Sequence, residues 1–291
     1  MTSNSTSLSV RVMSPRDIPF ADSLRSLAGW NQTVHDWAGF LEFAPNGCFI
    51  ADVGGVPAGT ATTILYDGKI GWIGMVLVHP EKRRRGVGNT LLRHTIAWLR
   101  SQGATSIKLD ATPAGKNVYL PLGFCEEYNL TRFEGKVPTA TPPSSAGHEV
   151  QAFTAAHIQQ VTDFDIRVFG VARSSVFSSL ITRSPNLCLV AYDRRRVCGY
   201  LIAREGAAAL QLGPWAARSP DIAISLFRTF MNQTPGRQLF LDIPGPNLDA
   251  TRYLCSLGFK PQRDFTRMYL GANPLPGTTT LVYGTSGAEK G

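Results

Sequence analysis

Apolar residues follow two different spacings along this chain, and together they predict a mixed α/β fold. Short apolar runs of strand length, at residues 72–78 and 107–111, alternate with stretches in which apolar residues recur every three or four positions. Two further apolar runs flank Gly54-Gly55, which predicts a β-hairpin over residues 48–65. Residues 89–100 have helical spacing and are expected to pack their apolar face on the strands.

Local signals predict two more helices, one near the start of the chain and one after the strand at residues 107–111. Ser14-Pro15 supply an N-cap and a first-turn proline, and the apolar residues that follow predict a helix ending near Gly29. A short helix is expected over residues 116–122, directly before Gly123-Phe124.

The same pattern occurs twice in the chain. Cys48-Phe-Ile-Ala returns 140 residues later as Cys188-Leu-Val-Ala, and Gly59 returns as Gly199 at the same offset. Later matches keep this order: Leu109-Asp110 with Leu241-Asp242, Leu122-Gly-Phe124 with Leu257-Gly-Phe259, and Thr131-Arg132 with Thr266-Arg267. Two tandem domains of one fold are therefore expected.

The stretch between the repeats, residues 137–147, is rich in Pro, Ser and Thr and has no periodic apolar positions. Such a composition is typical of an inter-domain linker. It separates a predicted first domain over residues 8–136 from a predicted second domain over residues 148–291.

Composition narrows the classes of partner. Hydrophobic residues make up 43% and charged residues 17% of the chain, an ordinary globular balance. No apolar window is long enough to cross a membrane, and the first residues lack a signal-peptide pattern, so a cytoplasmic protein is expected. The net charge of +8 favours anionic ligands such as a phosphorylated cofactor. Because no lysine-rich tail is present, neither nucleic acid nor a membrane is expected as a partner.

Cysteine and histidine usage gives no sign of a disulfide framework or a metal site. The five cysteines are odd in number and never spaced as C-x-x-C, and four of them lie in apolar or strand-like runs. Buried free thiols in a reducing compartment are therefore expected. The five histidines form no paired-ligand spacing, so no metal is expected.

The junction over residues 76–92 carries the clearest chemistry. An apolar strand runs into a loop containing Gly86 and Gly88, and an amphipathic helix follows. In such a junction the loop amides and the helix N-terminus converge, and the helix dipole favours negative charge. The glycines permit close approach of a ligand, and three consecutive arginines, at residues 83–85, add positive charge. The loop is predicted to bind a diphosphate, although it is neither a Walker A loop nor a dinucleotide fingerprint.

These residues resemble the signature of the GCN5-related N-acetyltransferase (GNAT) superfamily, Arg/Gln-x-x-Gly-x-Gly/Ala after a strand ending in Val-x-Pro. Arg83-Arg-Arg-Gly-Val-Gly88 fits every fixed position, and Thr266–Gly271 is similar to the end of the divergent second copy in bacterial tandem members. The resemblance implies α/β (α+β) domains, each a mixed, mostly antiparallel twisted sheet flanked by helices, and acetyl-CoA as co-substrate. The residues implied to bind acetyl-CoA are Val76, Leu77, Val78, Arg83, Arg84, Arg85, Gly86, Val87, Gly88, Asn89 and Thr112.

Tyr119 matches the tyrosine of the family pattern Tyr-x-x-x-Gly-Phe. The resemblance implies that its phenol protonates the departing coenzyme A thiolate as a general acid. A phenol with a pKa near 10 stays protonated at neutral pH, which suits that role. The alternative is a tyrosine that only packs beside the sheet. Thr112 stands where relatives usually carry an asparagine.

The second copy serves as an internal comparison, because it lacks the glycine-containing loop. Between Pro220 and Leu226 there are too few residues for it, and Leu254 stands where the first copy has Tyr119. The second domain is therefore expected to bind no acetyl-CoA. Asp110 is repeated as Asp242 in this copy without the loop, so it is expected to serve the fold.

The segment Trp30-Asn-Gln-Thr-Val-His-Asp-Trp37 resembles a run that lies over the acceptor pocket in tandem relatives. The candidate acceptor contacts are Trp30, Asn31, Gln32 and Asp36. Asp36 is also the candidate catalytic carboxylate, with helix capping as its alternative role. His79 is a further candidate base, or else a solvated loop residue, and Cys125 is considered as a covalent acetyl carrier.

The sequence thus predicts an acetyl-CoA-dependent N-acetyltransferase that acts on the amine of a small molecule by direct attack. The alternatives are a peptide or protein N-acetyltransferase and a non-catalytic acetyl-CoA sensor. The second domain is expected to be needed for turnover and to make the protein a monomer or a weak homodimer.

Overall fold

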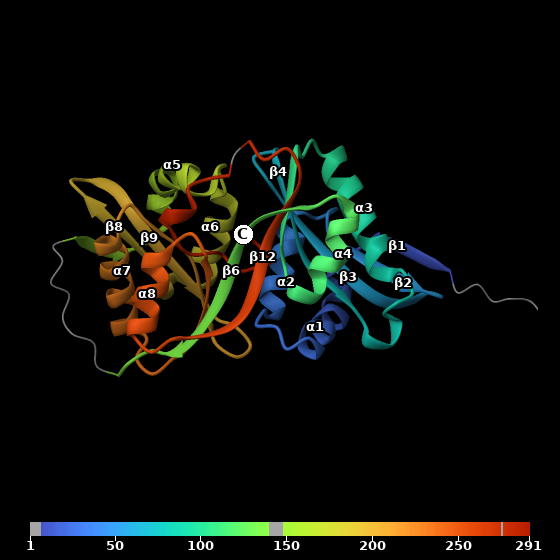
Figure 1. The fold of residues 1–291 in the computed structure, drawn as a ribbon, viewed down its shortest axis with the longest axis horizontal. Helices are drawn as coiled ribbons and strands as arrows, with labels where there is room; N and C mark the ends of the chain where they lie inside the picture. The colour runs from blue at the N-terminus through green and yellow to red at the C-terminus, as the bar shows by residue number, and fades with distance from the viewer. Residues whose placement is uncertain (1–6, 140–147, 275) are drawn as a thin grey trace, which may run out of the picture. The chain divides into compact units, whose positions relative to one another are not determined.

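The computed structural model describes residues 7–139, 148–274 and 276–291. By its internal packing the chain divides into two compact units, residues 1–109 and residues 110–291. Both units mix strands and helices (Figure 1). The mixed α/β fold predicted from the apolar spacing is confirmed.

The strands of the first unit follow the order β1-β2-β3-β4-β5. Neighbours pair antiparallel except β4 and β5, which are parallel. The strands are β1 (Leu8–Val12), β2 (Phe49–Val53), β3 (Val56–Tyr66), β4 (Ile70–Val78) and β5 (Ser106–Ala111), which runs across the division between the units. The helices are α1 (Ile18–Leu27), α2 (Val34–Phe43) and α3 (Val87–Ser101).

The predicted hairpin and helix of this unit form as the sequence indicates. Gly54 and Gly55 have φ of +63° and +79° and make the turn between β2 and β3. Helix α3 packs closely on the sheet at Gly59, where an added Cβ would lie 2.8 Å from the Leu77 oxygen. The same added Cβ would also crowd Val87 and Leu91 of α3, so this glycine is required by packing.

The second unit has the strand order β12-β6-β11-β10-β9-β8-β7, with β13 pairing on β10. Only β10 and β11 are parallel among these pairs. The strands are β6 (Cys125–Lys136), β7 (Glu149–Ala152), β8 (Cys188–Asp193), β9 (Arg196–Arg204), β10 (Leu210–Ala217), β11 (Gln238–Pro244), β12 (Lys260–Gly271) and β13 (Val282–Gly284). The helices are α4 (Pro113–Tyr119), α5 (Ile158–Phe169), α6 (Ser174–Arg183), α7 (Pro220–Gln233) and α8 (Leu248–Ser256).

Different helices pack on the two faces of this sheet, because adjacent residues of β9 point to opposite faces. An added Cβ on Gly199 would lie 2.9–3.0 Å from Ile222 and Leu226 of α7. Its neighbour Tyr200 instead contacts the rings of Phe164 on α5 and Phe177 on α6. Gly199 therefore repeats the packing role of Gly59, as expected for a residue found in both copies.

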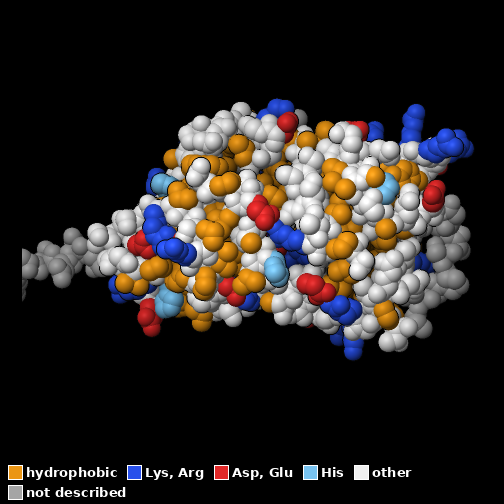
Figure 2. Space-filling view, turned by 180° about the vertical axis from the view of Figure 1, so that it is seen from behind, with side chains coloured by type: hydrophobic (Ala, Val, Ile, Leu, Met, Phe, Trp, Pro, Cys, Tyr) orange, Lys and Arg blue, Asp and Glu red, His pale blue; other side chains and the backbone are white. Residues whose placement is uncertain are grey.

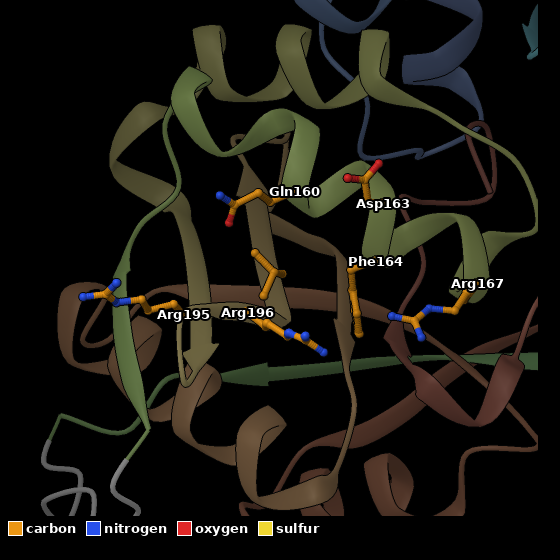
Figure 3. Close-up of a pocket in the computed structure, with 7 residues that line it drawn as sticks. Gln160, Asp163, Phe164, Arg167, Arg195 and Arg196 are labelled. Atoms are coloured by element: carbon orange, nitrogen blue, oxygen red, sulfur yellow. The ribbon is translucent and has the colours of Figure 1, made fainter.

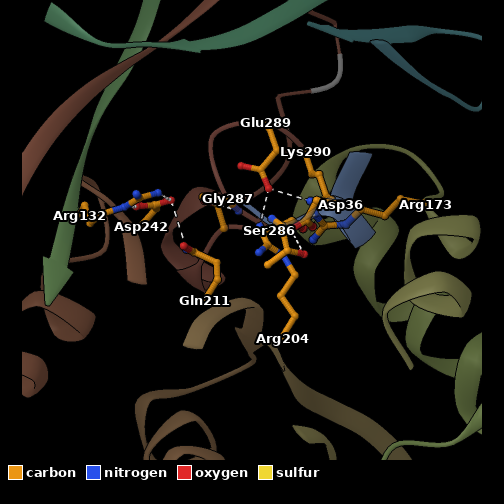
Figure 4. A network of polar contacts seen from close by, with 12 residues as sticks. Asp36, Arg132, Arg173, Arg204, Gln211, Asp242, Ser286, Gly287, Glu289 and Lys290 are labelled. Atoms are coloured by element: carbon orange, nitrogen blue, oxygen red, sulfur yellow. Dashed lines mark hydrogen bonds and ion pairs between the residues drawn. The ribbon is translucent and has the colours of Figure 1, made fainter. Parts of the chain in front are cut away.

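One strand of the first copy is built into the second unit. β6 lies between β11 and β12 and pairs antiparallel with both. Figure 1 shows β6 beside β12. On β6, the Arg132 guanidinium forms two bonds of 2.7 and 2.8 Å to Asp242 of β11 (Figure 4). On β12, the Arg267 guanidinium forms bonds of 2.8 and 2.9 Å to Asp110. Each arginine thus pairs with the aspartate of the other repeat, and the structural role expected for Asp110 is confirmed.

The boundary between the two packing units lies at residue 110, whereas the first copy of the sequence repeat extends to residue 136. Residues 110–136 belong to the second unit because β6 pairs with strands of the second copy. Of the predicted linker, residues 140–147 lie outside the described residues. Val137, at its start, is buried. Its N–H donates to the Arg237 oxygen at 2.9 Å and its oxygen accepts from the Gly236 N–H at 3.0 Å.

Candidate functional site

The turn from β4 to α3 has the form that the sequence predicts for an anion-binding loop. After β4 ends at Val78, a single 3₁₀ turn over Pro80–Lys82 leads to the three arginines. Arg84 has a φ of +59°, and Gly86 has a φ of +82° and is the N-cap of α3. Successive backbone N–H groups in such a turn form a concave site for anions.

The first amides of α3 are positioned to donate to such an anion. The first helical hydrogen bond runs from the Thr90 N–H to the Gly86 oxygen, at 2.9 Å. The N–H groups of Val87, Gly88 and Asn89 precede it and therefore have no partner within the helix. Because the N-cap is a glycine, it has no side chain with which to cap them.

The room around the two loop glycines suits a ligand that approaches the backbone. An added Cβ on Gly86 would meet no atom within 4 Å, although its positive φ disfavours any side chain. An added Cβ on Gly88 would make only an ordinary 3.5 Å contact with Val78. Neither glycine is required by packing within the protein, in contrast to Gly59.

The three arginines of the loop are exposed. The Arg83 Nε donates to the Val78 oxygen at 3.2 Å, which holds the start of the loop against the end of β4. Three guanidinium groups beside the helix N-terminus make the loop strongly positive. The residues present therefore fit a diphosphate group.

A β-bulge interrupts β4 just before this loop. The pairing with β3 shifts between Thr60 and Thr62, and Met75 opposite them has a φ of +50°. The Thr60 hydroxyl donates to the Met75 oxygen at 2.8 Å, which fixes the bulge. Met75 and Leu77 are buried and Val76 and Val78 are half-buried. Bulges of this kind re-aim backbone groups next to active sites.

Tyr119 and Thr112 lie together on α4, in the second unit. The Thr112 hydroxyl accepts from the Gly115 N–H at 3.1 Å and so caps this helix. An added Cβ on Gly115 would lie 3.1 Å from the Tyr119 ring and 3.2 Å from the Thr112 hydroxyl. The Tyr119 ring also makes an edge contact with Phe124, with centroids 5.9 Å apart. Burial raises the pKa of Tyr119 to about 12, so its phenol is protonated at neutral pH.

Asp36 has the capping role that the sequence left as its alternative. It is the third residue of α2, and its carboxylate accepts from the Thr33 N–H at 2.9 Å and from the Thr33 hydroxyl at 3.3 Å. Asp36, Asn31 and Gln32 are buried, while Trp30 is half-buried. The acceptor contacts of this segment stay a prediction.

The second copy has no counterpart of the loop. Only Arg218 and Ser219 stand between the end of β10 and the start of α7. Pro220 occupies the first position of α7, so one of the early helical N–H groups is missing altogether. At the position of Tyr119, α8 carries the buried Leu254. The loss that the sequence predicts for the second copy is confirmed.

Comparisons with known proteins identify both halves. A model described as "Acetyltransferase (GNAT) family" matches residues 19–124, and one described as "Acetyltransferase (GNAT) domain" matches residues 161–284. The chain belongs to the GNAT acetyltransferases, with two such domains in tandem. The GNAT resemblance stated from the loop is thereby confirmed, and the chain is an acyl-CoA N-acyltransferase.

One relative and two solved structures are similar to this chain over most of its length. The uncharacterized N-acetyltransferase YitH of Bacillus subtilis is 25% identical over 193 residues, 66% of this chain and 67% of YitH. A putative acetyltransferase from Pyrococcus horikoshii shares the fold with a TM-score of 0.81 at 22% identity, covering 100% of this chain and 98% of that chain. A tandem GNAT protein from the clavulanic acid biosynthesis pathway shares it with a TM-score of 0.64 at 16% identity, covering 92% and 99%.

Sequence reasoning missed two features of this GNAT chain. The positive φ of Met75 and the hydroxyl of Thr60 that fixes it leave no local signal, because the bulge arises from pairing between strands. The second feature lies at the turn between β8 and β9, where Arg194 and Arg195 have φ of +45° and +69°. The structure adds that Arg195 and Arg196 join Gln160, Asp163, Phe164 and Arg167 of α5 around a pocket of about 220 Å³ (Figure 3).

The remaining candidate groups are His79, Cys125 and any side chains that could bind a metal ion. The His79 side chain is half-buried, and the backbone N–H of His79 donates to the backbone oxygen of Ala58 at 2.8 Å. Cys125 is an exposed free thiol. Among the described residues, no cluster of three or more His, Cys, Asp or Glu side chains is arranged to hold a metal ion.

No helix within the described ranges is long and apolar enough to span a membrane. On the face that Figure 2 shows, basic and acidic side chains are interspersed rather than separated into patches.

Proposed function

We propose that this chain transfers an acetyl group from acetyl-CoA to the amine of a small molecule, and that the first copy carries the chemistry. The observation that carries the proposal is the difference between two equivalent turns. The β4–α3 turn has a left-handed Gly86 at its N-cap and three exposed arginines, whereas the β10–α7 turn has no glycine, a single exposed arginine (Arg218) and a proline, Pro220, at the first helical position. A protein that needed the turn only for its fold would not require the longer version.

In the proposed reaction the acceptor amine attacks the thioester carbonyl, so that a C–N bond forms as the C–S bond breaks. The first amides of α3 and the loop arginines hold the diphosphate. A backbone N–H near Val76 or Leu77, re-aimed by the bulge, stabilises the developing oxyanion. Tyr119 donates its phenolic proton to the departing thiolate. Asp36 is the proposed carboxylate for the proton that the amine loses.

The test is release of coenzyme A, measured across amines, amino acids, aminosugars and peptides. We expect turnover with a small amine and none for Gly86→Asp, because a carboxylate would stand where the loop must accept diphosphate oxygens. Gly258→Asp is a matched control, since Gly258 is also exposed, has a φ of +83° and has no atom near its added Cβ.

Two results would replace the proposal by its alternatives. A preference for peptides over every small amine would make the chain a peptide or protein N-acetyltransferase. Binding of acetyl-CoA without turnover of any amine would make it a sensor. Titration calorimetry on the same two variants separates loss of binding from loss of turnover.

A further inference from the structure

The second unit contains a gap between its two parallel strands. β10 and β11 pair over Leu210–Leu212 and Leu239–Leu241, yet β10 continues to Ala217 and β11 to Pro244. In the first copy, β4 and β5 also pair over three residues before β4 runs on to its bulge and loop. The first copy is proposed to bind acetyl-CoA beside this part of β4, and the second copy has an equivalent separation between β10 and β11.

Residues 278–291 fill that gap. β13 pairs antiparallel with β10 beyond the end of the β10–β11 pairing, with Gly284 opposite Trp215 and Val282 opposite Ala216. The next residue, Thr285, donates its N–H to the Asp242 oxygen on β11 at 2.9 Å. The segment therefore takes backbone hydrogen bonds from both of the strands that separate.

Side chains fix the segment in this position. Tyr283 is only 4% exposed, and its ring lies 5.2 Å from the buried Trp215 ring. The Asn247 amide donates to the oxygens of Thr280 and Val282, at 3.0 and 2.9 Å. An apolar ring contact and two side-chain bonds to the backbone together define one register for the segment.

Charged groups of the segment are also buried and paired (Figure 4). Arg204 forms an ion pair with Glu289, and Lys290 lies 2.7 Å from the same carboxylate. The Arg173 guanidinium donates to the Ser286 hydroxyl at 3.0 Å. Charged side chains are almost never fully buried unless they are paired, so this arrangement belongs to a docked segment.

On β10, a glycine lies where the backbone of residues 278–291 approaches most closely. Gly213 on β10 has a φ of +139°, and an added Cβ would lie 1.7 Å from the Thr285 oxygen. At the 140-residue offset the first copy has Ile73, whose side chain is buried. The second copy thus lacks a side chain at the place where its own chain approaches β10.

We propose that residues 278–291 are a built-in occupant of the second copy's cofactor gap, and that they close it to acetyl-CoA. The assignment of acetyl-CoA to the equivalent gap rests on the proposed function, whereas the docking of the segment does not. The missing loop removes the group that would hold a diphosphate, and the segment removes the room for the rest of the cofactor. One acetyl-CoA per chain follows.

Hydrogen exchange on the full chain, without any ligand, tests the docking. We expect the amides of residues 283–285 to exchange at least about 100-fold more slowly than in an unstructured peptide. Gly213→Ala should raise that exchange at least about tenfold, since its Cβ displaces Thr285, while Gly258→Ala should leave it unchanged. Exchange at the unstructured rate in the unaltered chain would overturn the proposal.

Titration calorimetry with coenzyme A tests the closure of the gap. One molecule bound per full chain, lost in Gly86→Asp, is the expected result. Two molecules per chain, or one that survives Gly86→Asp and is lost on disturbing residues 278–291, would overturn the proposal. Slow exchange of the segment in a chain that binds no coenzyme A would support the docking and contradict the proposed function instead, so the two failures are distinguishable.

Discussion

At the scale of single residues, Tyr119 is a packed phenol that carries its proton at neutral pH. Its ring is held by Gly115 and Phe124, and its phenol stays protonated far above neutral pH. For Tyr119→Phe we expect kcat to fall about 10²–10⁴-fold, because only the proton donor is removed. Affinity for acetyl-CoA, measured by calorimetry, should be unchanged since the ring packing is kept. An unaltered kcat would assign Tyr119 to packing alone.

The raised pKa of Tyr119 also predicts a pH dependence of stability. The folded chain holds the proton up to about pH 12, whereas the unfolded chain loses it near pH 10. Between these values the unfolded state binds fewer protons, so the free energy of unfolding contributed by this group falls as pH rises. Denaturant unfolding at pH 9–11 should show that the free energy of unfolding of the unaltered chain falls relative to that of Tyr119→Phe as pH rises. A constant difference would contradict the burial of the phenol.

A substitution at Gly88 is expected to affect ligand binding and protein stability in opposite directions. An added Cβ there makes only a 3.5 Å contact, and alanine is about 1 kcal/mol more favourable than glycine within a helix. We therefore expect Gly88→Ala to keep or raise Tm while weakening acetyl-CoA binding at least about tenfold, because the methyl group occupies the approach to the backbone. Thermal unfolding and calorimetry on one preparation check both effects. Undiminished affinity would remove Gly88 from the site.

At the scale of elements, the two crossed ion pairs hold β6 and β12 in the second unit. Asp110→Asn removes the carboxylate that forms two bonds with the buried Arg267, and Asp242→Asn removes the one that forms two bonds with Arg132. Loss of one partner of a buried pair costs about 3–5 kcal/mol, or about 6–20 °C in Tm for a unit of this size. Both variants should lose stability to a similar extent in thermal unfolding.

The exposed pair of Asp249 and Arg252 provides the control for these variants. Asp249→Asn should change Tm little, because exposed ion pairs are screened by solvent. A catalytic role for Asp110 would instead appear as a loss of kcat in Asp110→Asn well below its Tm, with Asp242→Asn fully active.

At the scale of the whole molecule, the placement of β6 makes the two copies hard to separate. β6 is paired along both edges with strands of the second copy. A chain cleaved between residues 140 and 147 should therefore stay together on size-exclusion chromatography at micromolar concentration. Separation into two folded halves under native conditions would contradict this arrangement.

The fragment of residues 1–137 gives the complementary result. Without β11 and β12, its β6 would expose two unpaired edges, and Arg132 and Asp110 would both lose their partners. Exposed edges of this kind promote aggregation. We expect this fragment to aggregate or to unfold at a lower temperature than the full chain, as measured by light scattering and circular dichroism.

The sequence by itself determined the local elements and the loop that is predicted to bind a diphosphate. Gly54-Gly55, Ser14-Pro15 and Arg83–Gly88 act through backbone conformation and charge over a few residues, which a sequence displays directly. The repeat also matched Gly59 with Gly199 and showed the loss of the loop in the second copy, whereas the packing role of the two glycines came from the structure. The predicted helix at 89–100 starts earlier, at Val87, because Gly86 serves as its N-cap.

The tertiary structure alone decided which partners these elements meet. Nothing local to Arg132 or Asp110 indicates that each pairs with the other copy, since both orders of β6 and β12 satisfy the same apolar pattern. The bulge at Met75 and the filling of the β10–β11 gap by residues 278–291 likewise depend on strands far apart in the chain. Pairing between distant strands is a property of register and burial, which a pattern of period two leaves open.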